Sequence, residues 1–192
     1  MQHKPLILAS RSPRRIELLR SAGLNPFVVE SGFKENQIKD EQPCDYAKML
    51  SYFKALNVSE IKPDYWVLGA DTIVVKNNRV LVKPESKDEA LDMISALSGT
   101  YHEVITGFSL ISPEKKEIYT QYVSTKVNFR RLSLKEINWY INTNEPYDKA
   151  GGYGIQGKAA SFAESVEGSY TNIVGLPLSQ VINLLQKTRV IY

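Results

Sequence analysis

The fold of this chain is decided close to its start, by the stretch LILASRSPRR at residues 6–15. Its apolar beginning predicts a short strand. Pro13 can occupy the first position of a helix, where its missing N–H costs nothing, and Ser12 then stands at the N-cap. Apolar side chains follow at helical spacing until Gly23, which predicts the end of the helix. The stretch therefore predicts a strand that leads directly into a helix.

Three arginines, Arg11, Arg14 and Arg15, lie at the start of the predicted helix. The positive end of the helix dipole, the first backbone N–H groups and guanidinium side chains all attract phosphate. The alternative is an ordinary capped helix with a solvated basic face, because the glycines of a Walker loop are absent. Taken alone, the segment leaves both interpretations open.

Composition limits the class of protein. The 192 residues are 43% hydrophobic and 23% charged, which is typical of one globular domain, or of one domain with two lobes. The net charge of +3 is too small to indicate nucleic-acid binding. Cys44 is the one cysteine, so an internal disulfide is excluded and a reducing, cytoplasmic location is expected. No apolar run is long enough to span a membrane, and two histidines argue against a histidine-based metal site or triad.

A second informative stretch, DYWVLGADTIVV, covers residues 64–75. Apolar residues on both sides of its centre predict a strand that is buried on both faces. An ionised aspartate in such a strand is costly unless it is paired, hydrogen-bonded or bound to a cation. Asp71 is therefore the leading candidate for chemistry; the alternative is a turn aspartate that caps a neighbouring backbone group.

The third informative stretch is EPYDKAGGYGIQG, residues 145–157. Its four glycines indicate a backbone that packs closely against something. Glu145, Asp148 and Lys149 would suit a charged, metal-assisted site, and Gln156 offers the donor and acceptor needed to read a pyrimidine edge. A glycine-rich loop followed by a strand is the alternative, and the residues alone do not decide between the two.

The remaining patterns predict further elements. Strands are expected over residues 24–30, 80–82, 101–110 (alternating) and 118–129, and helices over 45–58, 87–97 and 179–186, with another helix after Ser133. Glu136 completes a capping box with Ser133, and Asn77-Asn78 predicts a hairpin turn. Trp139 is expected in the core, and His102 is expected to be a hydrogen-bonded structural residue.

Two charged residues need support from elsewhere in the chain. Glu35 lies in a polar stretch, residues 31–42, which predicts a loop. Lys54 lies on the predicted helix over 45–58. Charged residues in these settings are more often solvated than functional.

Together these segments resemble the Maf family, the septum formation inhibitor proteins. The resemblance runs from Leu6 to the last helix. Its motifs occur in order: SRSPRR at 10–15, GADT at 69–72, KP at 83–84, LSG at 97–99 with His102, EPYDKAG at 145–151 and NIVGLP at 172–177.

The resemblance implies a single domain over residues 1–192 with an α/β fold, in which helices flank an elongated mixed sheet and two lobes surround a central cleft. It implies an enzyme that cleaves nucleoside triphosphates between the α- and β-phosphates with Mg²⁺ or Mn²⁺, giving the monophosphate and pyrophosphate. It also implies a homodimer.

Site residues follow from the motifs by position. Asp71 is implied to accept a proton from the attacking water and, with Glu35, to hold the metal; Lys54 and Lys83 are implied to take part in catalysis. The positions implied to bind substrate are Ser10, Arg14, Arg15, Thr72, Asp148, Lys149 and Gln156. Among these, Arg14, Thr72 and Gln156 resemble the specificity set of the family's dTTP/UTP branch.

Two positions depart from the family pattern. Arg11 stands where a small or neutral residue is usual, and Lys34 stands before Glu35 where an acidic residue is common. Arg11 either adds affinity for phosphate or points outward, and Lys34 weakens the case for metal binding on that side.

The chemistry of the residues agrees with the resemblance. Phosphoanhydride hydrolysis depends mainly on positioning and charge neutralisation, which basic residues and a carboxylate-bound Mg²⁺ or Mn²⁺ supply. The main hypothesis is a pyrophosphatase that acts on dTTP, UTP and modified pyrimidine triphosphates, with no membrane or nucleic-acid partner. The alternatives are a non-catalytic nucleotide- or RNA-binding regulator of cell division, and a purine-directed pyrophosphatase.

Overall fold

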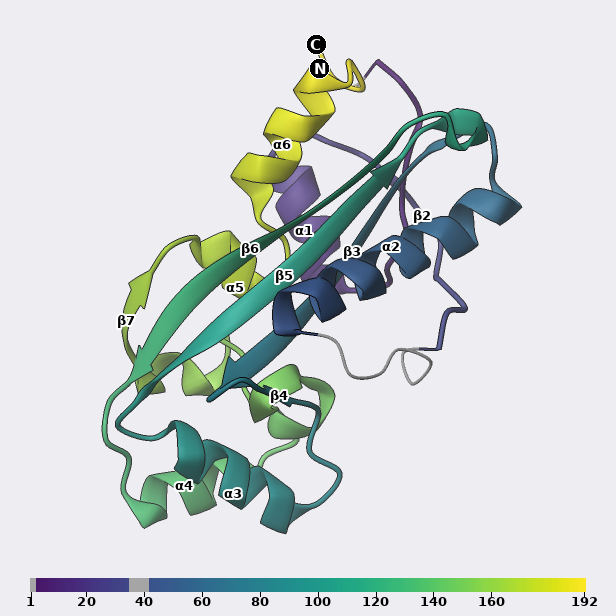
Figure 1. Cartoon of the computed structure of the whole chain (residues 1–192). Helices are drawn as coiled ribbons and strands as arrows, with labels where there is room; N and C mark the ends of the chain where they lie inside the picture. The colour runs from purple at the N-terminus through teal and green to yellow at the C-terminus, as the bar shows by residue number, and fades with distance from the viewer. Residues whose placement is uncertain (1–2, 35–41) are drawn as a thin grey trace.

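A computed structural model describes residues 3–34 and 42–192 of the chain. Its described part is built on one mixed sheet of seven strands, ordered β2-β1-β3-β5-β6-β7, with β4 also paired to β3 (Figure 1). The strands are β1 (Leu6–Leu8), β2 (Phe27–Val28), β3 (Trp66–Lys76), β4 (Arg79–Leu81), β5 (Tyr101–Ile111), β6 (Ile118–Phe129) and β7 (Ala163–Glu167). Strand β1 runs parallel to β2 and β3, and the other neighbours are antiparallel.

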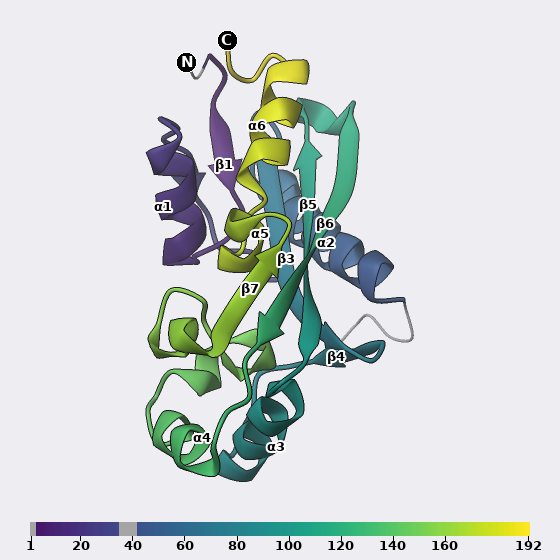
Figure 2. The same ribbon diagram turned by 90° about the vertical axis from the view of Figure 1, so that its left-hand side faces the viewer.

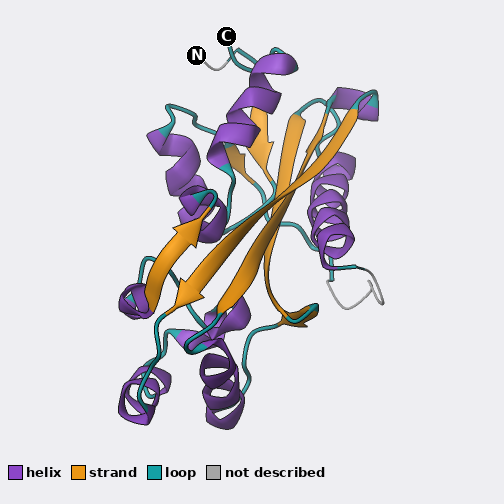
Figure 3. Ribbon diagram, turned by 60° about the vertical axis from the view of Figure 1, so that its left-hand side comes forward, coloured by secondary structure: helices purple, strands orange, loops and turns teal. Residues whose placement is uncertain are grey.

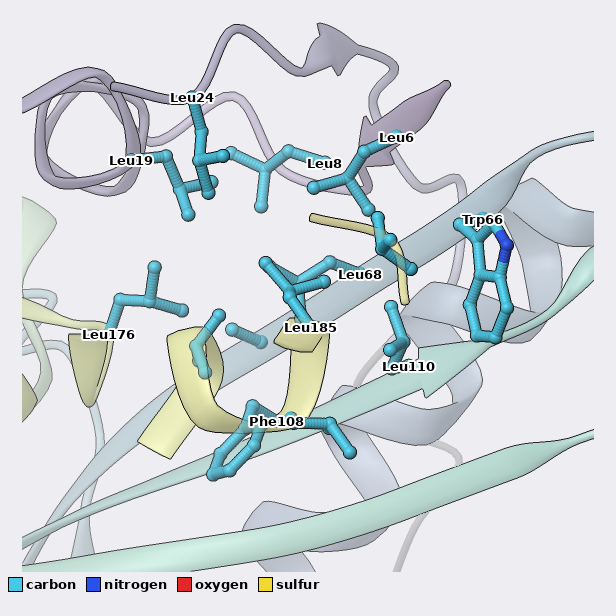
Figure 4. Packing of buried hydrophobic residues seen from close by; sticks show 14 of the residues in the cluster. Leu6, Leu8, Leu19, Leu24, Trp66, Leu68, Phe108, Leu110, Leu176 and Leu185 are labelled. Carbon is cyan, nitrogen blue, oxygen red and sulfur yellow. The ribbon is translucent and has the colours of Figure 1, made fainter. Parts of the chain in front are cut away.

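Helices cover both faces of this sheet (Figure 3). Helix α2 (Pro43–Ile61) lies on one face, and α1 (Pro13–Ser21), α5 (Tyr170–Val174) and α6 (Leu178–Lys187) lie on the other, as the labels of Figure 2 show. Side chains alternate along β3, so Trp66 and Leu68 pack toward α1 and α6 in the cluster of Figure 4, while Val67 and Ile73 pack toward α2. The sheet is therefore buried on both faces where it lies between these helices.

Two glycines let the backbone of α2 lie directly on the sheet. A Cβ atom at Gly69 would come within 2.3 Å of the Ser51 carbonyl oxygen, and one at Gly107 within 2.1 Å of the Ala47 carbonyl oxygen. Neither position accepts a larger residue without a shift of the helix backbone. This close approach places the middle of α2 over the centre of β3.

A second lobe covers the other end of the long strands (Figure 2). It contains α3 (Lys87–Leu97), α4 (Leu134–Ile141) and short 3₁₀ segments at Pro146–Asp148, Ala150–Gly152 and Lys158–Phe162, and its core is built around Phe129, Tyr140 and Phe162. A further 3₁₀ segment, Pro113–Lys115, joins β5 to β6 at the opposite end of the sheet (Figure 1). The expected α/β architecture is confirmed: helices flank a mixed sheet.

Several expected elements differ from the structure. The strand over 24–30 is reduced to two residues, β2, at the edge of the sheet. Strand β5 is buried almost throughout instead of alternating, because helices lie on both of its faces. Trp139 is 53% exposed, so its expected core position is wrong; α4 buries Ile137, Tyr140 and Ile141 instead. Strand β7 and helix α5 were not predicted.

The two predicted helix caps have different outcomes. Ser133 and Glu136 form the expected capping box at the start of α4. Ser12 stands at the N-cap of α1, but its hydroxyl makes no capping hydrogen bond. Its N–H instead donates to the Ser10 hydroxyl at 3.2 Å. Within residues 3–34 and 42–192, no helix is both long and apolar enough to cross a membrane.

Candidate active site at the edge of strand β3

The register of the sheet leaves part of β3 paired on one side only. Strand β1 pairs with β3 as far as Leu68, and β4 pairs with it from Val74 onward. Among the described strands, β5 alone pairs with residues 69–73 between them. Asp71 and Thr72 project to opposite faces of the sheet, yet both line a cleft of about 1040 Å³ at this edge.

Asp71 lines this cleft and lies on the face of β3 that α2 covers. It is 8% exposed, and its carboxylate forms an ion pair with the ammonium of Lys54. Lys54 reaches it because Gly69 allows the helix backbone to lie close to the strand. An ionised carboxylate in so buried a place needs such a partner, which Lys54 supplies. A carboxylate held in this way can orient a water molecule and accept its proton.

Arg15 lies on the opposite face of β3 and is held by hydrogen bonds to the protein. Its Nε donates to the Gly175 carbonyl at 2.8 Å, one terminal nitrogen donates to Ser10 Oγ at 3.1 Å, and the other donates to Thr72 Oγ1 at 3.2 Å. These bonds join the start of α1 to β3 and to the turn between α5 and α6. Arg14, beside it, lines the cleft.

The second lobe contributes Lys83, Asp148, Lys149 and Gln156 to the cleft wall. The Lys149 ammonium forms an ion pair with Asp148 and donates to the Glu145 carbonyl at 3.0 Å. Basic side chains therefore reach the cleft from both lobes.

The glycines near Gln156 are explained by close packing. A Cβ atom at Gly154 would come within 2.7 Å of the Lys149 side chain, and one at Gly157 within 2.0 Å of the Glu145 carboxylate. That carboxylate accepts a hydrogen bond from the Lys158 N–H at 2.9 Å and so holds the segment after Gln156. The sequence stretch at 145–157 is thus closely packed, and strand β7 follows it after the 3₁₀ segment Lys158–Phe162.

His102 is structural, as expected. It is 2% exposed, its Nε2 lies 2.7 Å from the hydroxyl of Tyr153, and its Nδ1 has no hydrogen-bond partner among the described residues. Burial, with a smaller effect from the positive charge of Lys76, lowers the pKa of His102 to about 4. The neutral ring supports Tyr153, which lines the cleft.

Most of the predicted site residues therefore meet in one cleft. Its lining includes Arg14, Arg15, Lys54, Asp71, Thr72, Lys83, Asp148, Lys149 and Gln156. Ser10 lies behind it and holds Arg15, and Glu35 falls outside the described residues. The sequence did not predict a role for the Gly175 carbonyl, which accepts a hydrogen bond from Arg15. The NIVGLP motif, which contains Gly175, was the one indication in the sequence.

Comparisons with known proteins match nearly the whole chain. A family profile described as "Maf-like protein" matches residues 5–188. A dTTP/UTP pyrophosphatase of Alkaliphilus oremlandii is 51% identical over 177 residues, which cover 91% of each chain. One of Syntrophus aciditrophicus is 47% identical over 186 residues, which cover 97% of this chain and 91% of the relative.

A solved structure of a HAM1 protein from Coxiella burnetii aligns with 96% of this chain and all of its own, at 13% identity and a TM-score of 0.46. The profile match over nearly the whole chain and the identity to full-length relatives decide the family. Together with the motifs gathered around the cleft, they show that this chain belongs to the Maf-like family.

Proposed function

We propose that this protein is a dTTP/UTP pyrophosphatase, which hydrolyses these nucleotides to the monophosphate and pyrophosphate. The observation that carries the proposal is the position of the Asp71–Lys54 ion pair on the floor of a cleft to which both lobes contribute basic side chains. The activity named for relatives at 43–51% identity supports the same reaction.

The cleft offers separate groups for the two parts of a nucleotide. Arg14, Lys83 and Lys149 line it and would neutralise the triphosphate. The Gln156 amide is both donor and acceptor, as recognition of a thymine or uracil edge requires. Apolar side chains in the lining, among them Leu50, Ile73 and Ile155, suit a base and a sugar.

Asp71 would orient the attacking water and accept its proton. Lys54 keeps the Asp71 carboxylate in place and would be close to the charge that develops during hydrolysis. Arg15 would act by holding the cleft wall together, through its hydrogen bonds to Ser10, Thr72 and Gly175.

A divalent cation is the cofactor we propose. Within residues 3–34 and 42–192, no group of three or more His, Cys, Asp or Glu is placed to hold an ion. The Asp71 carboxylate nevertheless suits Mg²⁺ or Mn²⁺, since Mg²⁺ is usually bound by one or two carboxylates together with substrate phosphates. When bound, the ion would neutralise phosphate charge. Glu35 stays a predicted second ligand.

The proposal is tested by incubating the protein with dTTP or UTP and Mg²⁺. Pyrophosphate should be released, and Asp71→Asn should slow its release by about 10²- to 10⁴-fold, the contribution typical of a general base. Asp92→Asn, an exposed aspartate on α3, is the matched control and should leave the rate unchanged. Release of orthophosphate would show that a different bond is cut.

The non-catalytic alternative makes an opposite prediction. A nucleotide- or RNA-binding regulator would bind its ligand without releasing product, and Asp71→Asn would leave that binding unchanged. The predicted homodimer and the cytoplasmic location stay predictions.

A further inference from the structure

A chain of hydroxyl groups runs from the cleft wall into the protein. Thr72 Oγ1 lies 2.9 Å from Thr106 Oγ1, which in turn donates to the Asn172 carbonyl at 3.0 Å. Thr106 is on β5, is completely buried and does not line the cleft, whereas Thr72 does. The side chain of Asn172 is itself anchored, because its amide donates to the Val104 carbonyl at 2.8 Å.

The distances favour one arrangement of the hydroxyl protons over the other. If Thr106 donates to Asn172, Thr72 donates to Thr106, and both bonds are short. In the reverse arrangement Thr106 donates to Thr72, and Thr72 must use the Gly175 carbonyl at 3.4 Å, which already accepts from Arg15. The first arrangement makes two good hydrogen bonds and the second makes one.

In both arrangements the Thr72 proton goes to an acceptor of the protein. In the first, Arg15 donates to one of the two lone pairs of Thr72 Oγ1, so one lone pair remains for a substrate; in the second, Thr106 fills that lone pair as well. A phosphate oxygen is also an acceptor, so it cannot form a hydrogen bond with the Thr72 hydroxyl in the first arrangement. A group that donates a hydrogen bond can.

We propose that Thr106 is a positioning residue that commits the Thr72 hydroxyl to accept a hydrogen bond from the nucleoside part of the substrate. The cleft thereby selects an N–H or O–H group over an acceptor at the same place. The choice of nucleotide rests on the proposed function. In dTTP the nucleoside donors are the imide N–H of the base and the 3′-hydroxyl of the sugar.

Two analogues distinguish these sources. In dCTP an acceptor nitrogen replaces the imide N–H, and in 3′-deoxy-3′-fluorothymidine triphosphate a weakly accepting fluorine replaces the hydroxyl. We would measure kcat/KM with Mg²⁺, and dissociation constants without metal, for dTTP and both analogues. Thr106→Val removes the buried partner of Thr72 at nearly constant volume, and Thr106→Ser keeps it. Ser109→Ala, which removes another buried hydroxyl of β5, is the control.

With Thr106→Val, the Thr72 hydroxyl becomes free to donate. The preference for dTTP over one analogue should fall about 3- to 10-fold, the effect of one neutral hydrogen bond. A lower preference for dTTP over dCTP identifies the base as the donor. A lower preference for dTTP over the fluoro analogue identifies the sugar. Thr106→Ser should restore the original preference, and Ser109→Ala should not alter it. If Thr106→Val fails to fold, Thr106→Ala replaces it.

Equal losses for all three nucleotides would overturn the proposal, because a purely structural role weakens every substrate alike. Failure of the proposed function gives a different result: the unsubstituted protein would release no pyrophosphate. The ratios of dissociation constants would then still decide whether Thr106 controls the preference.

Discussion

Acidification should destabilise the protein through His102. In the folded state the ring is buried, and protonation would give its Nδ1 an N–H that has no acceptor among the described residues. Burial, the larger cause, and Lys76 lower the pKa of His102 from 6.5 to about 4. Between these two pH values the unfolded chain binds a proton that the folded chain does not, so the free energy of unfolding falls as pH falls.

The size of the effect follows from the two pKa values. The loss should be about 2 kcal/mol at pH 5 and about 3 kcal/mol at pH 4, with little further change below that. Above pH 6.5 His102 is neutral in both states, and the full stability is present.

Urea unfolding of the original protein and of His102→Gln between pH 4 and 7.5 would measure this loss. Glutamine carries a polar group at the position of Nε2, can still bond the hydroxyl of Tyr153 and has no proton to gain. Its cost in packing is the same at every pH, so the difference between the two unfolding free energies isolates the titration. A difference that stays constant from pH 7.5 to pH 4 would refute the reasoning.

Three further substitutions have defined outcomes. Gly107→Ala places a Cβ atom against the backbone of α2, so the melting temperature should fall by several degrees, as measured by calorimetry. Ser133→Ala removes the capping box with Glu136 and should lower the free energy of unfolding by about 1 kcal/mol in urea, without affecting KM. Gly157→Ala displaces the Glu145 carboxylate that holds the segment after Gln156; KM for dTTP should rise in steady-state assays, and an unchanged KM would contradict this role.

Local signals were sufficient for much of the fold. Helix α3 and strand β6 have the predicted bounds, because apolar residues at helical spacing and a run of β-branched and aromatic residues mark them clearly. Asn77 and Asn78 both adopt positive φ, as the predicted hairpin turn requires. The capping box of α4 was likewise readable from two residues.

The errors arise where distant parts of the chain decide the environment. Trp139 is apolar by type, but the orientation of α4 buries its neighbours Ile137 and Tyr140 instead. The alternation expected in β5 is lost because α2 covers a face that would otherwise meet water. Strand β7 has no apolar run, and it exists because β6 provides a partner.

In the candidate site, too, local sequence predicted the residues but not the contacts that they make with distant parts of the chain. Motifs pointed to Asp71 and Arg15, but not to their different surroundings: the first meets an ammonium group across one face of the sheet, and the second is bonded to the protein on the other face. The partnership of Thr72 with Thr106 depends on the register of two strands, which no local pattern reveals.

The three longest strands have a mechanical consequence. Strands β3, β5 and β6, with 11, 11 and 12 residues, extend from one lobe into the other without a break. Because these strands are continuous, any widening of the cleft must bend a hydrogen-bonded ribbon along its length. Such stiffness keeps the two walls of the cleft at a fixed separation. The length of a nucleotide that can contact both walls is then limited by that separation.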